Sequence, residues 1–247
     1  MWTTVLVIAA VLVGSSMQRI TGMGFALVAA PFLVLLLGPV DGVIVVNACG
    51  ALTASIILMR VFRQVDWRRY SLLAVCAVVG IVPGSYILQF VSAAWLEISI
   101  GVLVAAGLTV SVNLGRVVVR DRLGFRVMAG LTSGFMNTTA GVGGPAVSIY
   151  AIATGWPQRS FAATMQPYFL SIGLASLASK FGLGSADLPQ LPVLVWVFIG
   201  CACIVGLIVG DRLATVIEPH VARRLLVVVA YLGSFATIVR GVLELLV

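Results

Sequence analysis

Glycine and proline gather in one short stretch of an otherwise apolar chain. In TTAGVGGPAVSIY, residues 138–150, three glycines (Gly141, Gly143 and Gly144) and Pro145 interrupt a hydrophobic sequence. Proline suits the first turn of a helix, where its missing N–H costs nothing, and the glycines leave no side chain in front of that turn. A helix N-terminus carries free N–H donors and a partial positive charge. The stretch therefore predicts an anion-binding helix N-terminus.

A similar break, TGMGF, lies at residues 21–25. We expect its second helix to start at Gly24 and to run opposite to the helix after Pro145, so that two helix N-termini converge near the membrane midplane. Amides and hydroxyls surround both breaks, although each could instead satisfy a helix–helix hydrogen bond. The predicted substrate-binding residues are Gln18, Arg19, Thr21, Gly22, Gly24, Asn47, Asn137, Thr138, Thr139, Gly141, Gly143, Gly144, Pro145 and Gln166.

Arg19 is the charged residue that the sequence places within a break rather than at a loop or helix end. Ionisable groups at that depth are costly and usually functional. The alternatives are that Arg19 caps the preceding helix or extends to the membrane interface. We interpret it as an anion ligand.

The elements that position these residues are membrane helices. The chain of 247 residues is 61% hydrophobic and 9% charged, against about 25% charged in soluble domains. Apolar runs of spanning length occupy residues 42–59, 72–90, 98–114, 161–179, 191–209 and 225–239, and a span needs about 20 residues. The runs are continuous rather than alternating, which excludes a β-barrel. We predict an all-α integral membrane protein without a soluble domain.

The segments on either side of each break are shorter. Residues 4–16 and 127–135 precede the breaks, and residues 25–37 and 146–153 follow them. Segments of about 10 to 14 residues reach only about 15 to 20 Å. We therefore expect partial helices, either re-entrant or tilted, that meet within the membrane, where unpaired backbone must be buried or line a watery cavity.

Basic residues fix the orientation. They cluster in four loops, at Arg60, Arg63, Arg68 and Arg69; at Arg116, Arg120, Arg122 and Arg126; at Arg159; and at Arg212, Arg223 and Arg224. The positive-inside rule places these loops in the cytoplasm and both termini in the periplasm. The outer side then carries Asp41, Glu97, Asp187 and Glu244, with Lys180 and Arg240. Spread over loops in this way, the net charge of +7 does not indicate nucleic-acid binding.

This topology exposes an internal repeat. Residues 1–115 and 126–247 each contain a glycine break followed by three spans, in opposite orientations, with the basic loop 115–126 between them. GIVPG at 80–84 matches GLIVG at 206–210, a spacing typical of helix packing. Inverted repeats of this kind are typical of secondary transporters.

These motifs resemble the TauE/SafE family of sulfite exporters and related sulfur-anion transporters. The likeness rests on GFMNTTAGVGGPAVSIY at 134–150, on GSSMQRITGMGFALVAAPFLVLLLG at 14–38 and on VDWRR at 65–69. It implies a bacterial inner-membrane permease with two inverted repeats that moves sulfite, sulfonates, thiosulfate or similar anions. Met23 and Phe25 stand where the family commonly has glycine, so the resemblance does not name the substrate.

The sequence lacks the residues that other functional classes need. The chain has no phosphate-cradling GxxxxGK[ST] loop, and its one histidine, His220, lies in a basic loop. Cys49, Cys76, Cys201 and Cys203 lie in apolar helices without metal-ligand partners. We therefore expect no enzyme activity, no metal and no cofactor, and as partners a small anion and the lipid bilayer.

The remaining question is transport itself. No carboxylate falls in the predicted membrane core, so a proton relay is missing, although unwound carbonyls beside Ile20 and Thr139 could hold sodium. We favour export of a sulfur-containing anion driven by the membrane potential, by protons or by both. An ion-coupled importer, or a non-transporting scaffold or assembly factor, is the alternative, and a homo-oligomer is compatible with the sequence.

Overall fold

The computed structural model describes residues 2–22, 24–113, 120–216 and 218–246. Met23, Arg116 and the expected domain boundary at residue 115 lie outside the described residues, as do the side chains of His220 and Arg223. Everything below refers to the described part of the chain.

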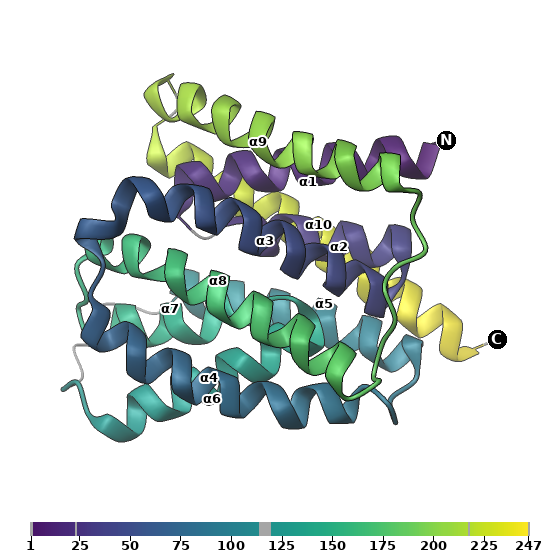
Figure 1. Cartoon of the computed structure of the whole chain (residues 1–247), viewed down its shortest axis with the longest axis horizontal. Coiled ribbons are helices and arrows are strands. Elements are labelled where there is room, and N and C mark those ends of the chain that lie inside the picture. The colour runs from purple at the N-terminus through teal and green to yellow at the C-terminus, as the bar shows by residue number, and fades with distance from the viewer. Residues whose placement is uncertain (1, 23, 114–119, 217, 247) are drawn as a thin grey trace.

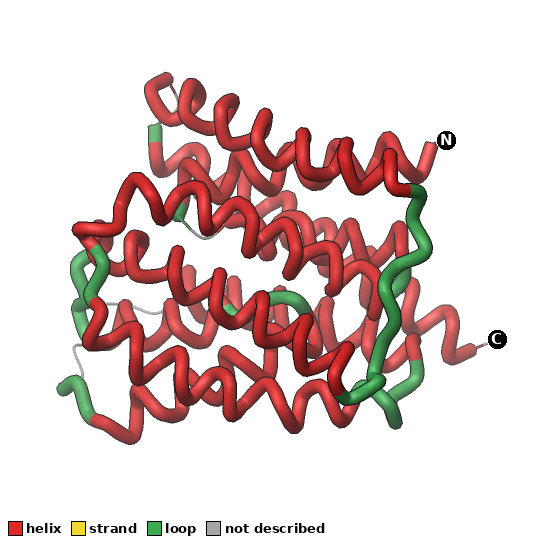
Figure 2. Tube along the Cα trace, viewed as in Figure 1, coloured by secondary structure: helices red, strands yellow, loops and turns green. Residues whose placement is uncertain are grey.

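The described residues form ten α-helices and no strand (Figures 1 and 2). The first five are α1 (Trp2–Thr21), α2 (Gly24–Leu37), α3 (Pro39–Val61), α4 (Trp67–Ile87) and α5 (Ala93–Asn113). A short 3-10 turn, η1 (Phe62–Gln64), follows α3. The second five are α6 (Leu123–Ala140), α7 (Gly144–Ala153), α8 (Gln158–Gly182), α9 (Val193–Val216) and α10 (Pro219–Leu246).

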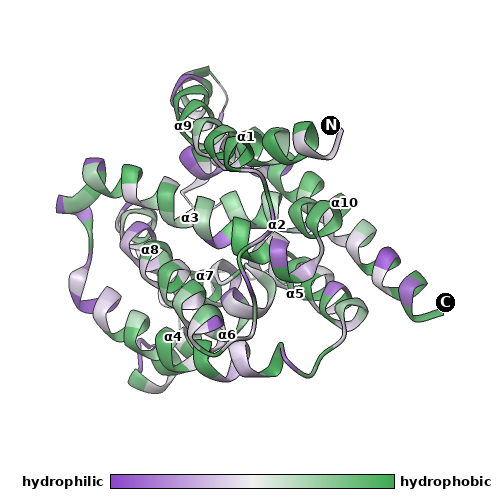
Figure 3. Cartoon of the chain, turned by 45° about the vertical axis from the view of Figure 1, so that its right-hand side comes forward, coloured by the Kyte–Doolittle hydropathy of each residue, from purple (hydrophilic) through white to green (hydrophobic). Residues whose placement is uncertain are grey.

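Six segments of the described chain are long and apolar enough to cross a membrane: α1, α3 with η1, α4, most of α5, α9 and residues 224–246 of α10. Their outward surfaces are apolar, as Leu232, Phe235 and Val193 illustrate, each at least 65% exposed. Hydrophobic residues dominate the helices in Figure 3. The prediction of an all-α integral membrane protein is confirmed.

The two segments expected to precede the breaks as short helices are longer than predicted. Helix α1 has 20 residues and α6 has 18, because the small polar residues near each break continue the helix. Their hydroxyls bond carbonyls four residues earlier: Ser15 to Val11 (2.8 Å), Thr21 to Met17 (2.7 Å) and Thr139 to Phe135 (2.8 Å). A hydroxyl satisfied in this way does not interrupt the helix.

Helices α2 and α7, which follow the breaks, are short as predicted, with 14 and 10 residues. At 1.5 Å per residue they extend about 21 Å and 15 Å, less than the roughly 30 Å of hydrocarbon. Helix α2 packs against α1, α3 and α10, whereas α7 packs against α5 and α6.

Helix pairing follows one pattern in both halves. Helix α1 packs on α9 and α6 on α4, while α5 packs on α10 and α3 on α8. Exchanging α1–α5 with α6–α10 reproduces this set of pairs. The inverted repeat itself remains a prediction, which this pairing supports.

The GxxxG glycines lie at the closest of these contacts. A Cβ on Gly206 or Gly210 of α9 would lie 2.6 Å from the Leu12 carbonyl oxygen or 2.8 Å from the Ser16 carbonyl oxygen of α1. On α4, Gly80 meets the Leu131 carbonyl of α6 in the same way. The interpretation of these glycines as helix-packing surfaces agrees with this geometry.

The basic loops gather at one end of the bundle. Three contacts join them: Arg60 to Asp211, Arg159 Nε to Gln64 Oε1 (3.1 Å) and Arg69 Nη2 to Asp121 Oδ2 (3.3 Å). The marked N- and C-terminal ends of the chain both lie at the opposite end, apart from each other (Figure 1). This separation is the one that the topology prediction requires.

Candidate anion-binding site

The two helix breaks have the same backbone geometry. Gly22 (φ 87°) and Gly141 (φ 73°) are both left-handed, a conformation that glycine adopts at helix C-termini without strain. The Gly22 N–H donates to the Gln18 carbonyl (2.8 Å) and the Gly141 N–H to the Asn137 carbonyl (2.9 Å). Each break therefore closes its helix four residues after an amide side chain.

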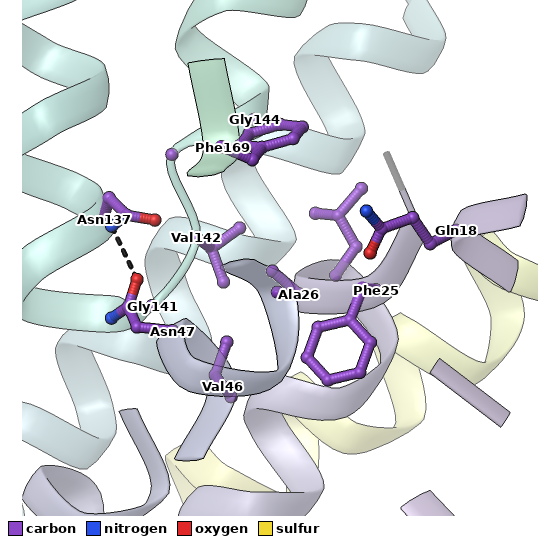
Figure 4. A pocket seen from close by; sticks show the side chains of 13 residues that line it. Gln18, Phe25, Ala26, Val46, Asn47, Asn137, Gly141, Val142, Gly144 and Phe169 are labelled. Atoms are coloured by element: carbon purple, nitrogen blue, oxygen red, sulfur yellow. Dashed lines mark hydrogen bonds between the residues drawn. The ribbon is translucent and has the colours of Figure 1, made fainter. Parts of the chain in front are cut away.

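A small cavity lies where the breaks meet. Its lining comes from α1, α2, α3, α6, α8 and the break before α7: Gln18, Phe25, Ala26, Leu27, Val46, Asn47, Gly50, Asn137, Gly141, Val142, Gly143, Gly144 and Phe169. Figure 4 shows Gln18 on one side of this cavity and the Asn47–Asn137 pair on the other. Apolar side chains form the wall of the cavity between them.

Two buried amide pairs flank the cavity. The Asn137 amide donates to Asn47 Oδ1 (2.7 Å), and the Gln18 amide donates to Gln166 Oε1 (3.4 Å). All four side chains are at most 4% exposed. The same interval along the chain separates Gln18 from Asn137 and Asn47 from Gln166, which is the spacing that the predicted repeat would give.

Two helix N-termini also reach the cavity. The first turn of α2 contributes Phe25, Ala26 and Leu27, and the start of α7 contributes Gly143 and Gly144. These turns present N–H groups that lack partners within their own helices, together with the positive end of each helix dipole. The described lining contains no charged side chain, so the positive potential at the cavity comes from these backbone dipoles.

Of the fourteen predicted residues, the structure brings six to the cavity wall. These are Gln18, Asn47, Asn137, Gly141, Gly143 and Gly144. Gln166 lies one hydrogen bond behind Gln18 and also donates to the Gly22 carbonyl (2.8 Å). It holds the first amide and the first break together.

Arg19 lies elsewhere. Because α1 continues to Thr21, Arg19 belongs to the last helical turn, and the expectation that it lies within the break is wrong. Its guanidinium forms an ion pair with Asp211 of α9, which also pairs with Arg60. Arg19 is absent from the cavity lining.

The predicted hydroxyl ligands also turn away from the cavity lining. Thr21 and Thr139 bond carbonyls of their own helices. The Thr138 hydroxyl contacts Ser85 Oγ of α4 (3.0 Å). These groups satisfy helices and helix contacts, the alternative that the sequence left open.

Gly22, Gly24 and Pro145 serve packing. A Cβ on Gly22 would lie 2.9 Å from the Ala162 Cβ, and one on Gly24 would lie 2.7 Å from Leu226 Cδ1. Pro145 packs against Gly107 of α5, where the glycine leaves room for its ring. These three residues fix where α2 and α7 begin.

The sequence did not identify the apolar half of the wall. Phe25, Val46, Val142 and Phe169 all line the cavity. Such residues carry no distinguishing signal in a chain that is 61% hydrophobic. Position beside a glycine break could have indicated Phe25 and Val142, but not Val46 or Phe169.

A family model described as "Sulfite exporter TauE/SafE" matches residues 6–237. The chain belongs to the TauE/SafE family. No curated protein and no solved structure matches the chain. Membership makes this a multi-pass membrane protein of a transporter family. The match covers both glycine breaks and every residue of the cavity wall.

Proposed function

We propose that this TauE/SafE protein exports a small sulfur-containing anion, such as sulfite or an organosulfonate, through the cavity between the helix breaks. The observation that carries the proposal is the convergence of two helix N-termini and three amide side chains (Gln18, Asn47 and Asn137) on one buried space. Amide donors and N–H groups are the partners that an oxyanion accepts hydrogen bonds from. The apolar wall suits the organic part of a sulfonate.

The proposed setting is a bacterial inner membrane, with the basic loops in the cytoplasm and both termini in the periplasm. The arginine-rich ends of α3, α4, α6 and α9 support this orientation, because such residues are retained on the cytoplasmic side. Their contacts at one end of the bundle, including Arg60 to Asp211 and Arg69 to Asp121, agree with it.

The proposed driving force is the membrane potential. An inside-negative potential drives one negative charge outward with about 2.3 kcal/mol per 100 mV. The described cavity wall has no carboxylate that could carry a coupled proton. A proton that travels on the substrate itself remains compatible with this scheme, and a sodium-coupled importer is the rival.

Binding can be tested on the purified protein with a panel of anions. We expect sulfite, thiosulfate and methanesulfonate to raise the unfolding temperature, because ligands that bind the folded state stabilise it by mass action. Gluconate and acetate serve as controls for ionic strength and for carboxylates. Absence of any selective stabilisation would favour the scaffold alternative.

A further inference from the structure

Lys180, in the last turn of α8, is a buried cation without a partner. Its side chain is fully buried, and its Nζ has no hydrogen-bond partner among the described residues. A lysine that extends to the membrane interface would keep its ammonium exposed. An isolated buried ammonium is very costly, so a lysine in this position either loses its proton or takes an anion as counter-ion, and the described chain supplies no such anion.

The other fully buried charged side chain among the described residues does not fill this role. Glu97 of α5 is also fully buried, but its Oε1 pairs with Arg240 Nε of α10 at 3.5 Å. Arg240 pairs in addition with Glu244 (3.2 Å). Glu97 therefore has its own cation, and Lys180 has no described carboxylate.

One face of α8 connects Lys180 to the cavity. Phe169 lines the cavity, and a Cβ on Gly173 would lie 3.1 Å from the Asn47 carbonyl oxygen. Ser176 Oγ accepts a hydrogen bond from the Asn47 amide (3.5 Å). Lys180 follows one turn later, since residues three and four apart share a helix face.

The direction along this face is outward from the cavity. Lys180 lies about 6 Å beyond Ser176 along the helix axis, in the last turn of α8. The C-terminal end of α8 lies at the end of the bundle opposite the basic loops (Figure 1). Helical side chains lean toward the N-terminus of their helix, which for Lys180 leads back toward Ser176. The lysine thus lies between the cavity and the outer end of the bundle.

The predicted inverted repeat accounts for the missing partner. At the basic end, Arg19 pairs with Asp211. At the other end the equivalent residues, one after Gly84 and three before Gly141, are Ser85 and Thr138, which share a hydrogen bond of 3.0 Å. Two hydroxyls therefore stand at this end where the basic end has an ion pair, so Asp211 has no carboxylate counterpart here.

We propose that Lys180 forms a second anion subsite, one step outside the central cavity, where the transported sulfur oxyanion serves as the counter-ion of its ammonium. Ser176 contributes a hydroxyl on the cavity side of this subsite. The inference rests on the proposed function, because the anion that reaches Lys180 is the one that the cavity transports. This subsite would bind the anion between the cavity and the outer side.

Thermal unfolding of the purified full-length protein tests the subsite. Lys180→Met keeps the apolar stem and removes the charge. We expect it to raise the unfolding temperature without anion, since an uncompensated buried charge is gone. We also expect the stabilisation by methanesulfonate to fall by about half if the two subsites have similar affinities. Arg240→Met is the matched control, a paired cation at the same end. It should lower the unfolding temperature and keep the full response to methanesulfonate.

The outcomes separate the subsite from the proposed function. A Lys180→Met protein that unfolds at a lower temperature than wild type, or that fails to fold, overturns the subsite, and so does one with an undiminished methanesulfonate response. If the wild type responds to none of the sulfur oxyanions, the proposed function fails instead. In that case a higher unfolding temperature of Lys180→Met would still identify an uncompensated cation.

Discussion

Asn137 and Gln18 illustrate at the residue scale how an apolar membrane helix can present polar groups to a ligand. Each amide lies four residues before a left-handed glycine, and each is held by an amide from the other half of the chain, Asn47 or Gln166. Burial makes an unsatisfied amide costly, so these pairs keep the donors in a fixed place. Such fixed donors bind without a large ordering cost.

Replacing one of these amides should weaken binding. We predict that Asn137→Leu lowers the affinity for methanesulfonate by roughly 10- to 100-fold, the equivalent of one hydrogen bond to a charged group. Isothermal titration calorimetry on the purified protein measures this affinity. The matched control is Gln190→Leu, an exposed amide in the loop before α9, which should bind as wild type does. Unchanged affinity in a folded Asn137→Leu protein would remove this residue from the site.

Arg19 provides a contrasting prediction. Its ion pair with Asp211 is about one-third exposed, so we expect Arg19→Met to lower the free energy of unfolding by about 1 kcal/mol or less and to leave the methanesulfonate affinity unchanged. Chemical denaturation and titration report the two quantities separately. A stable Arg19→Met protein that no longer binds would make Arg19 an anion ligand, as the sequence indicated.

How far the sequence predicted the site depends on the type of residue. Gln18, Asn47 and Asn137 were identifiable because polar side chains are rare in membrane helices and usually have a purpose. Thr138 and Thr139 carried the same signal but satisfy helix contacts, and only three-dimensional packing separates the two uses. Phe169 gave no signal, since the wall it forms is as apolar as the lipid-facing surface.

At the scale of elements, the breaks depend on glycines that must adopt a left-handed backbone. We predict that Gly141→Ala destabilises the protein by about 1–2 kcal/mol, the cost of that conformation for an L-residue, and weakens anion binding, because its Cβ would lie 3.2 Å from Val46 Cγ1 in the cavity wall.

A glycine of ordinary helical conformation serves as the control for this strain. Gly200→Ala in α9 adds a Cβ with no heavy atom within 4 Å and should be neutral or stabilising by up to about 1 kcal/mol. Denaturant unfolding and anion titration of both variants test the account. Equal effects of the two substitutions on stability and on anion binding would show that neither depends on the left-handed turn.

Helix α7 is anchored near its C-terminal end by a partly buried cluster. Asp121 accepts hydrogen bonds from Arg126 Nε (2.8 Å) and from the Tyr150 hydroxyl of α7 (2.9 Å), and Arg69 lies 3.3 Å away. The Arg126 hydrogen bond, above all, holds the pKa of Asp121 below its usual value. This carboxylate ties α4, α6 and α7 together at the basic end.

The lowered pKa predicts a pH dependence. The contribution of Asp121 to stability is fully present above about pH 4, the ordinary pKa of aspartate, and is lost as pH falls through the lower folded pKa. We expect Asp121→Asn to reduce the free energy of unfolding by about 1–3 kcal/mol at neutral pH and to flatten its decline below pH 4. A variant with the wild-type acid profile would contradict this role.

Element lengths were only partly predictable. The six long apolar runs each correspond to one helix, except that residues 88–90 and 191–192 lie beyond helix ends and Leu114 lies outside the described residues. Helices α1 and α6 were underestimated because the polar residues before each glycine were assigned to the break, whereas their hydroxyls bond the preceding turn. The short lengths of α2 and α7 followed from the glycine breaks and the next loops.

At the scale of the whole molecule, the pairings of α1 with α9 and of α4 with α6 place two similar halves around one cavity. The halves differ in charge. The basic end carries the ion pairs of Arg19, Arg60 and Asp211, whereas Ser85 and Thr138 share a hydrogen bond at the equivalent place. Unlike ends do not set the direction of net transport, which follows the driving force on the substrate, here the proposed membrane potential.

The membrane potential provides the most direct test of the account. Purified protein is reconstituted into vesicles loaded with radiolabelled methanesulfonate, and a potassium gradient with valinomycin sets the potential. We predict efflux that accelerates when the interior is made negative, that needs no sodium gradient and that Asn137→Leu abolishes, while Gln190→Leu retains it. Efflux that ignores the potential and rises only with an imposed sodium gradient would contradict potential-driven export.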